Sequence, residues 1–162
     1  MLTLAALAFT LLSPAFAAGA PIPRAHANAG AECGSGGNLS PPLQWSGVPK
    51  RTRSFALTLV DPDAKAPGGW VHWVAYDIPP QTSTLAAGAR PAHEALTSFG
   101  TAGYGGPCPP GGDPPHHYHF TLYALDLAAL TLPSRPRIGD VLAAMKGHIL
   151  GEATLIGTYQ QR

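Results

Sequence analysis

The sequence predicts a mostly β protein: an antiparallel β-sandwich with a short C-terminal helix and few other helices. Several short apolar runs have the length of strands, and only one stretch has a helical period. The 19 glycines and 18 prolines cluster between these runs, so they mark turns rather than disorder. A length of 162 residues fits one domain that can bury its own core.

Four segments are predicted to be strands because they are apolar or alternating and end at turn residues. The second of them, WVHWVAYD, stops before Pro79-Pro80. The strands are expected at residues 54–60, 70–77, 117–125 and 154–159. Residues 100–115 are too rich in glycine and proline for regular structure, and a connection of that length is usually functional.

One helix is predicted after these strands. Asp140 is the candidate N-cap, and Gly151 is the candidate stop. The apolar residues that recur at helical spacing are Val141, Leu142, Met145 and Ile149.

The first 17 residues form an apolar run closed by an Ala-x-Ala pattern, which predicts a signal peptide cut after Ala17. No Lys or Arg precedes the run, so a short membrane anchor or a buried helix are the alternatives. Residues 18–36 are predicted to be a flexible mature N-terminus, and residues 37–162 a single domain. No later segment is long and apolar enough to span a bilayer.

Export to the periplasm or the exterior would place the chain in an oxidising compartment. The two cysteines, Cys33 and Cys108, are therefore predicted to form one disulfide. Two buried free thiols are the alternative. The bridge would tie the N-terminal segment to the proline-rich loop around Cys108.

The charge pattern excludes some partners. Charged residues make up 12% of the chain, about half the usual share of about 25%. Ten basic side chains against nine acidic ones create no field that would attract nucleic acid or an anionic membrane.

Strand alternation predicts a polar pocket. With a period of two, Trp70 and His72 share one face of their strand with Val74 and Tyr76. In the other strand one face is formed by His116, Tyr118, Phe120 and Leu122. If these faces meet, His72, His116 and Tyr118 converge beside the loop that carries Asp61. A lone histidine in a strand more often has a structural role, whereas two histidines that each adjoin an unusual loop favour a structural role and a binding role about equally.

Two loops would complete this pocket. Backbone N–H groups at Gly105, Gly106 and Cys108 could hold an anion, while Pro109 and its neighbours keep the loop rigid. A stiff connector without a ligand is the alternative. Asp61 and Asp63 flank Pro62, where they either close an Asx turn or orient a histidine.

Other chemistries have less support. His117 and His119 share a strand face but would need a third ligand for zinc, so no metal and no cofactor are predicted. No nucleophile elbow, phosphate-binding loop or dinucleotide fingerprint is present. Cys108 could act as a nucleophile near His116 only if its thiol were free.

These motifs resemble the phosphatidylethanolamine-binding proteins, in particular the bacterial branch described as Raf kinase inhibitor-like. The resemblance covers residues 38–159 and rests on Asp61-Pro62-Asp63, Trp70-x-His72-Trp73, Gly106-Pro107-Cys108-Pro109-Pro110 and His116-x-Tyr118. Two positions depart from the family pattern: His117 stands where arginine is usual, and Cys108 stands where the animal proteins have glycine.

The resemblance implies a β-sandwich with a small anion pocket near one end. The residues that would form it are Asp61, Trp70, His72, Gly106, Cys108, Pro109, His116 and Tyr118. Because family members bind phosphate-like groups and phospholipid head groups, we expect a non-catalytic binding protein for a small anionic or phosphorylated ligand. Alternatives are an inhibitor of a protease or kinase acting by protein–protein contact, and a phosphoester hydrolase that uses His and Asp.

Overall fold

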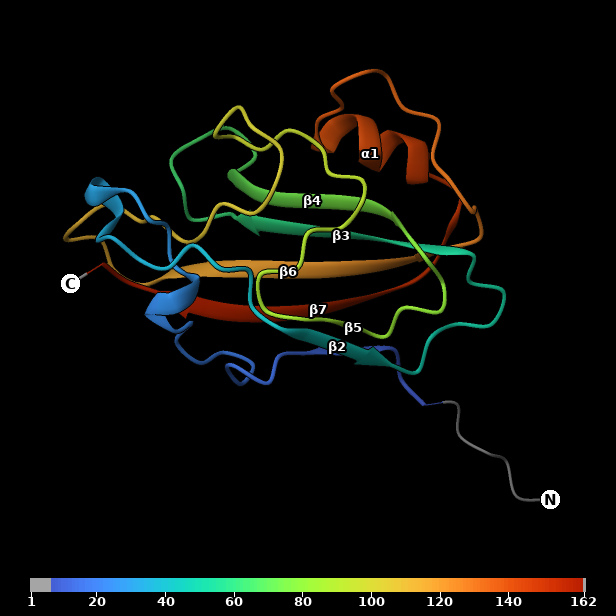
Figure 1. Ribbon diagram of the computed structural model, residues 1–162, viewed down its shortest axis with the longest axis horizontal. Coiled ribbons are helices and arrows are strands. Elements are labelled where there is room, and N and C mark those ends of the chain that lie inside the picture. Colours follow the sequence, from blue (N-terminus) through green and yellow to red (C-terminus); the bar gives the residue numbers. More distant parts are fainter. Residues whose placement is uncertain (1–6, 162) are drawn as a thin grey trace.

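The computed structural model describes residues 7–161 as two antiparallel sheets and one α-helix (Figure 1). The larger sheet has the order β4-β3-β6-β7 and the smaller one the order β1-β2-β5. The strands are β1 (Thr10–Leu12), β2 (Leu43–Ser46), β3 (Ser54–Asp61), β4 (Trp70–Ile78), β5 (Thr84–Leu85), β6 (His116–Leu125) and β7 (Ile149–Tyr159). The helices are α1 (Ile138–Met145) and the 3-10 turns η1 (Arg24–His26) and η2 (Ala31–Cys33). The predicted fold class is confirmed.

The main core lies between the two sheets. Strand β3 is buried along almost its whole length because β4 and β6 pair with both of its edges. Alternation in β6 works as predicted: Tyr118, Phe120 and Leu122 enter the core, while His117 is exposed. The smaller sheet closes the core from the other side with Leu43 and Trp45.

Helix α1 covers the outer face of the larger sheet, where Val141 and Met145 pack. Its predicted limits were wrong. Asp140 lies inside the first turn, where its carboxylate accepts the backbone N–H of Arg137 at 2.8 Å. Because Gly147 adopts a φ of 83°, a conformation that favours glycine, the chain leaves the helix before Ile149, which begins β7.

The predicted connection at residues 100–115 lacks helix and strand, apart from one isolated bridge at Ala102. It lies at the same end of the sandwich as η1, η2 and the C-terminus (Figure 1). The long loop, the N-terminal segment and the chain end are therefore neighbours in space, although they are far apart in sequence.

The N-terminal segment is part of the folded domain. Strand β1 pairs with β2, and Leu11 and Phe16 are buried in the main core. Cleavage after Ala17, as the predicted signal peptide at 1–17 requires, would remove both side chains and an edge strand. Residues 1–6 lie outside the described residues.

Residues 18–36, for which a flexible segment was predicted, are packed against the domain in the structure. Ile22, His26 and Cys33 are buried there, and the backbone of this segment is hydrogen-bonded to strand β7 and to the pocket loop. The sequence did not predict this packing, because the segment contains few large apolar residues. Backbone hydrogen bonds and a disulfide hold it in place instead.

Within residues 7–161, no helix combines the length and the apolar character that a membrane crossing requires.

The structural role of the N-terminal segment can be tested with two adjacent leucines. Leu11 is 3% exposed and Leu12 is 47% exposed. We expect Leu11→Ala to lower the free energy of unfolding by about 3 kcal/mol, because it opens a cavity in the core. Leu12→Ala should change it by less than about 0.5 kcal/mol. Urea unfolding, with the mass of the purified chain checked, measures both. Equal stabilities would mean that the segment does not belong to the mature domain.

Candidate ligand pocket

The pocket lies where three strands of the larger sheet meet the long loop. Strand β3 ends at Asp61, which is paired with Trp70 at the start of β4. Strand β6 starts at His116 and runs antiparallel to β3 on its other edge. The end of one strand and the beginnings of its two neighbours therefore bring Asp61, Trp70 and His116 to the same edge of the sheet.

A register shift in β4 aims His72 at this edge. Leu59 pairs with Trp73, while Val60 pairs with Val71. His72 is therefore an unpaired, extra residue of β4, opposite the point between Leu59 and Val60 in β3. Strict alternation predicted His72 on the face of Val74, which packs toward α1. The bulge instead turns the His72 ring toward Tyr118, with ring centroids 5.3 Å apart.

The residues enclose a cavity of about 370 Å³. Its lining consists of Asp61, Ala64, Lys65, Ala66, Trp70, His72, Phe99, Cys108, Pro109, Pro110, Asp113 and His116. Six of the nine predicted site residues belong to this lining: Asp61, Trp70, His72, Cys108, Pro109 and His116. Its volume lies within the range of about 300–1,000 Å³ found for small-molecule sites.

His116 is held between two carboxylates. Its Nδ1–H donates to Asp61 Oδ2 at 2.7 Å, and its Nε2–H donates to Asp113 Oδ2 at 3.3 Å. Burial opposes protonation of this ring, but the hydrogen bonds to Asp61 and Asp113 and the charges of Asp61 and Asp63 outweigh it and raise the pKa of His116. The raised pKa favours the protonated ring, in which both nitrogens act as donors.

His72 has the opposite electrostatic character. Its Nδ1–H donates to the Gly105 carbonyl at 2.7 Å, and the Gly105 N–H donates back to the His72 carbonyl at 2.9 Å. Burial lowers the pKa of His72, so the ring is neutral and its Nε2 is an acceptor. Within residues 7–161 this Nε2 has no hydrogen-bond partner.

Tyr118 lies beneath the cavity rather than in its lining. The side chain is 0% exposed and its hydroxyl has no partner among the described residues. Burial and the charge of Asp61 raise the pKa of Tyr118, so the group remains a hydroxyl. The expectation that this phenol lines the pocket is not met, and its ring instead supports His72.

The loop donors are largely used within the protein. The Gly105 N–H binds His72, and the Gly106 N–H donates to Asn38 Oδ1 at 2.8 Å. A Cβ at Gly106 would clash with the His26 carbonyl, so this glycine permits close packing against the N-terminal segment. Gly106 lies outside the cavity lining. The third predicted donor, the Cys108 N–H, lies near the buried Tyr118 hydroxyl.

The second aspartate of the motif lies at the rim. Asp63 Oδ2 accepts the backbone N–H of His117 at 2.7 Å and its ring Nδ1–H at 2.8 Å. These hydrogen bonds lower the pKa of Asp63. The Asx turn considered for this motif is present, because the Asp63 N–H donates to Asp61 Oδ1 at 2.9 Å. Asp61 therefore both closes the turn and orients His116.

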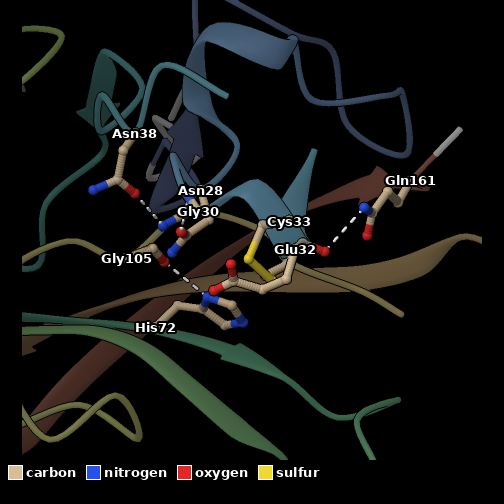
Figure 2. The surroundings of a disulfide bond; sticks show 10 residues. Asn28, Gly30, Glu32, Cys33, Asn38, His72, Gly105 and Gln161 are labelled. Carbon is tan, nitrogen blue, oxygen red and sulfur yellow. Dashed lines mark hydrogen bonds between the residues drawn. A yellow bond between two sulfur atoms is a disulfide. The ribbon is translucent and has the colours of Figure 1, made fainter. Parts of the chain in front are cut away.

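The predicted disulfide between Cys33 and Cys108 is present, with Cα atoms 4.7 Å apart. It joins η2 to the pocket loop next to the His72–Gly105 pair (Figure 2). Because the Cys108 sulfur is bonded, it is not available as a nucleophile. The bridge instead makes Cys108 a fixed part of the pocket wall.

Sequence reasoning missed Lys65, Phe99 and Asp113. The Phe99 ring contacts both Trp70 and His72, with centroids 5.4 and 5.5 Å away. Phe99 precedes the predicted loop by one residue and had no motif around it. Asp113 could have been found from its spacing, because it lies in the predicted loop, three residues before His116.

Within residues 7–161, no group of three or more His, Cys, Asp or Glu side chains is arranged to hold a metal ion. The rings of His117 and His119 do share one strand face, as predicted, but His117 is paired with Asp63.

Fold and site together define a class: a two-sheet β protein with a small, partly apolar pocket at one end of its larger sheet. Residues 12–160 match the family described as "Phosphatidylethanolamine-binding protein". The chain belongs to this family, as its motifs predicted. The match begins before Ala17, which agrees with the packing of the N-terminal segment into the domain.

Three relatives illustrate the similarity. A UPF0098 protein of Methanothermobacter thermautotrophicus is 47% identical over 133 residues, covering 78% of this chain and 85% of that protein. The crystal structure of Escherichia coli YbcL superimposes with a TM-score of 0.87 at 35% identity, over 95% of this chain and 99% of that one. A Mycobacterium tuberculosis protein named as the lipoprotein LppC is 42% identical over 93% of this chain and 72% of its own length.

The role of the disulfide can be tested by substituting Cys33, which lies outside the pocket lining. The bridge closes a separation of 75 residues, so Cys33→Ser should lower the free energy of unfolding by about 4 kcal/mol on the chain-entropy model. Urea unfolding of the oxidised wild type, the reduced wild type and the variant measures this. A variant as stable as the oxidised wild type would contradict it.

The charged state of His116 predicts a pH dependence of stability. Because folding raises the pKa of His116, its contribution is complete below the unfolded value of 6.5 and is lost as pH rises through the folded value. The free energy of unfolding should therefore fall above pH 6.5, by at most about 1.4 kcal/mol per pH unit.

Replacing His116 with Gln should remove this slope. His148→Gln is the control, since it deletes another ring hydrogen-bonded to an aspartate, Asp126, and leaves His116 in place. Urea titrations across the pH range measure the slopes. An unchanged slope in His116→Gln would show that another group carries it.

Proposed function

We propose that this protein is a non-catalytic binding protein for a small anion with a phosphate-like group, free or as part of a phospholipid head group. The observation that carries the proposal is the pair of histidines in the cavity lining. His116 offers a positively charged donor, and the neutral His72 offers an acceptor that has no protein partner among the described residues.

A singly protonated phosphate group fits this pair. Its negative oxygen accepts a hydrogen bond from His116 Nε2, and its P–OH donates to His72 Nε2. The Lys65 side chain brings one further donor, its ammonium group, to the lining. Two carboxylates face the same space, so the anion binds through directed hydrogen bonds rather than through a net positive field.

The rest of the lining supports a ligand that also has a non-polar part. Trp70, Phe99 and Pro109 present apolar surface around the polar floor. Aromatic and proline side chains lose little conformational entropy on binding, so they suit a rigid recognition wall. A phosphate ester with a short organic group would use both surfaces.

A binding role fits the fixed state of the polar groups better than catalysis. His116 is held between two carboxylates, and His72 has its Nδ1 proton bound to the Gly105 carbonyl. A general base must accept and release a proton during turnover. A ring that two carboxylates keep protonated is poorly suited to that task.

The disulfide and the relative named as a lipoprotein support an exported location. A ligand of the cell envelope, such as a phospholipid head group, would then be within reach.

Inorganic phosphate provides the direct test. We expect millimolar phosphate to shift the ring nitrogen signals of His72 and His116 in NMR spectra. The ring of His148 should not respond, because it lies outside the cavity lining. His116→Gln should weaken binding by about tenfold or more, since it deletes a hydrogen bond from a charged donor. Unchanged His72 and His116 signals at millimolar phosphate would refute the proposed function.

A further inference from the structure

Asp113 places a carboxylate where the proposed ligand must bind. Its Oδ2 accepts the Nε2–H of His116 at 3.3 Å, which is the donor that the proposed function assigns to the anion. Asp113 also belongs to the cavity lining. A carboxylate is itself a small anion, so the protein already supplies a partner for the ring nitrogen that an external anion needs.

We infer that Asp113 is an affinity-determining residue of this pocket: its carboxylate competes with the external anion for His116 Nε2 and must leave before the anion binds. The inference rests on the proposed function and adds a competition within the same site. The pocket then exists in a closed form, with Asp113 on His116, and an open form with the ring nitrogen free.

Of the two carboxylates on His116, Asp113 is the one that can leave. Asp61 is 4% exposed in its side chain, and its oxygens accept hydrogen bonds of 2.7 Å from His116 and 2.9 Å from the Asp63 N–H. The Asp113 side chain is 29% exposed, and its bond to His116 is longer. Water can solvate Asp113 when it rotates away, whereas Asp61 would lose both bonds inside the protein.

The surrounding turn allows this rotation without a change in the backbone. The Asp113 N–H donates to the Pro110 carbonyl at 3.2 Å, and Gln160 Nε2 donates to the Asp113 carbonyl at 3.0 Å. These contacts hold the main chain on both sides of the residue. Only the side-chain torsions of Asp113 need to change.

Competition of this kind has a recognisable signature. When a closed form excludes the ligand, the apparent affinity is reduced by the fraction of protein that is open, and this factor is the same for every excluded anion. Simple charge repulsion behaves differently, because it grows with the charge of the ligand. Acetate carries one negative charge and the phosphate dianion carries two, so at a pH at which phosphate is mainly the dianion the two anions distinguish the two effects.

The experiment compares Asp113→Ala with Asp63→Ala. Both substitutions remove one negative charge at the same end of the molecule, but the Asp63 side chain is paired with His117 at the rim and lies outside the cavity lining. Acetate and inorganic phosphate are titrated separately into the wild type and each variant, with the His72 and His116 ring signals as the readout. The pH is one at which those signals show a protonated His116 in every protein compared and at which the phosphorus NMR shift of free phosphate shows mainly the dianion.

We expect Asp113→Ala to bind both anions more tightly by the same factor, about tenfold, which is the size expected for losing one competing charged hydrogen bond. Asp63→Ala should have a smaller effect that is larger for phosphate than for acetate. Asp113→Asn, which keeps a weaker neutral acceptor near His116, should give an intermediate gain. Thermal unfolding confirms that each variant is folded.

The outcomes separate the two proposals. If the wild type binds phosphate and Asp113→Ala binds no more tightly, or gains only what Asp63→Ala gains, the competition is refuted and the anion pocket stands. A gain that grows with ligand charge also refutes it, in favour of simple repulsion. If no folded variant binds either anion, the proposed function fails, and this inference fails with it.

Discussion

The position of β3 between two antiparallel partners is the constraint on which the site depends. Antiparallel pairing brings the end of one strand beside the beginning of the next. Asp61 at the end of β3 therefore lies beside Trp70, which begins β4, and close to His116, which begins β6. A one-residue slip of β6 would turn His116 to the opposite face of the sheet, away from Asp61. The apolar side chains of β6 prevent this slip, because it would also take Tyr118 and Phe120 out of the core.

The sheet also holds a buried charge pair that would be costly without good geometry. Removing a carboxylate and an imidazolium from water costs several kcal/mol per ion, which their attraction offsets only when each group is fully hydrogen-bonded. Asp61 meets this requirement through the Asp63 N–H and His116, and His116 through its two carboxylates. The Asx turn after β3 thus helps to stabilise the buried charge, because the Asp63 N–H donates to the Asp61 oxygen that does not bind the His116 ring.

The sequence predicted the parts of this structure that follow from simple periodicity. The alternation of β6 placed His116 and Tyr118 on the core face, where the structure has them. The position of His72 could not be derived in this way, because a bulge breaks the alternation of β4 and depends on pairing with β3. The apolar segment before Ala17 was ambiguous for another reason: a core strand and a secretion signal have similar composition. Phe99 and Lys65 reach the cavity only through tertiary packing.

The pocket combines a rigid floor with a more exposed wall, which is the part of the long loop that carries Asp113. The floor consists of strand ends and of the reciprocal hydrogen bonds between His72 and Gly105. The disulfide and the bond from Asn38 to Gly106 extend this rigidity to the first half of the long loop. Beyond Pro110 the loop side chains are more exposed, and Asp113 contacts the floor through its hydrogen bond with His116. The proposed competition at Asp113 therefore needs no change in the core, because Asp61 still holds the ring of His116 when Asp113 rotates away.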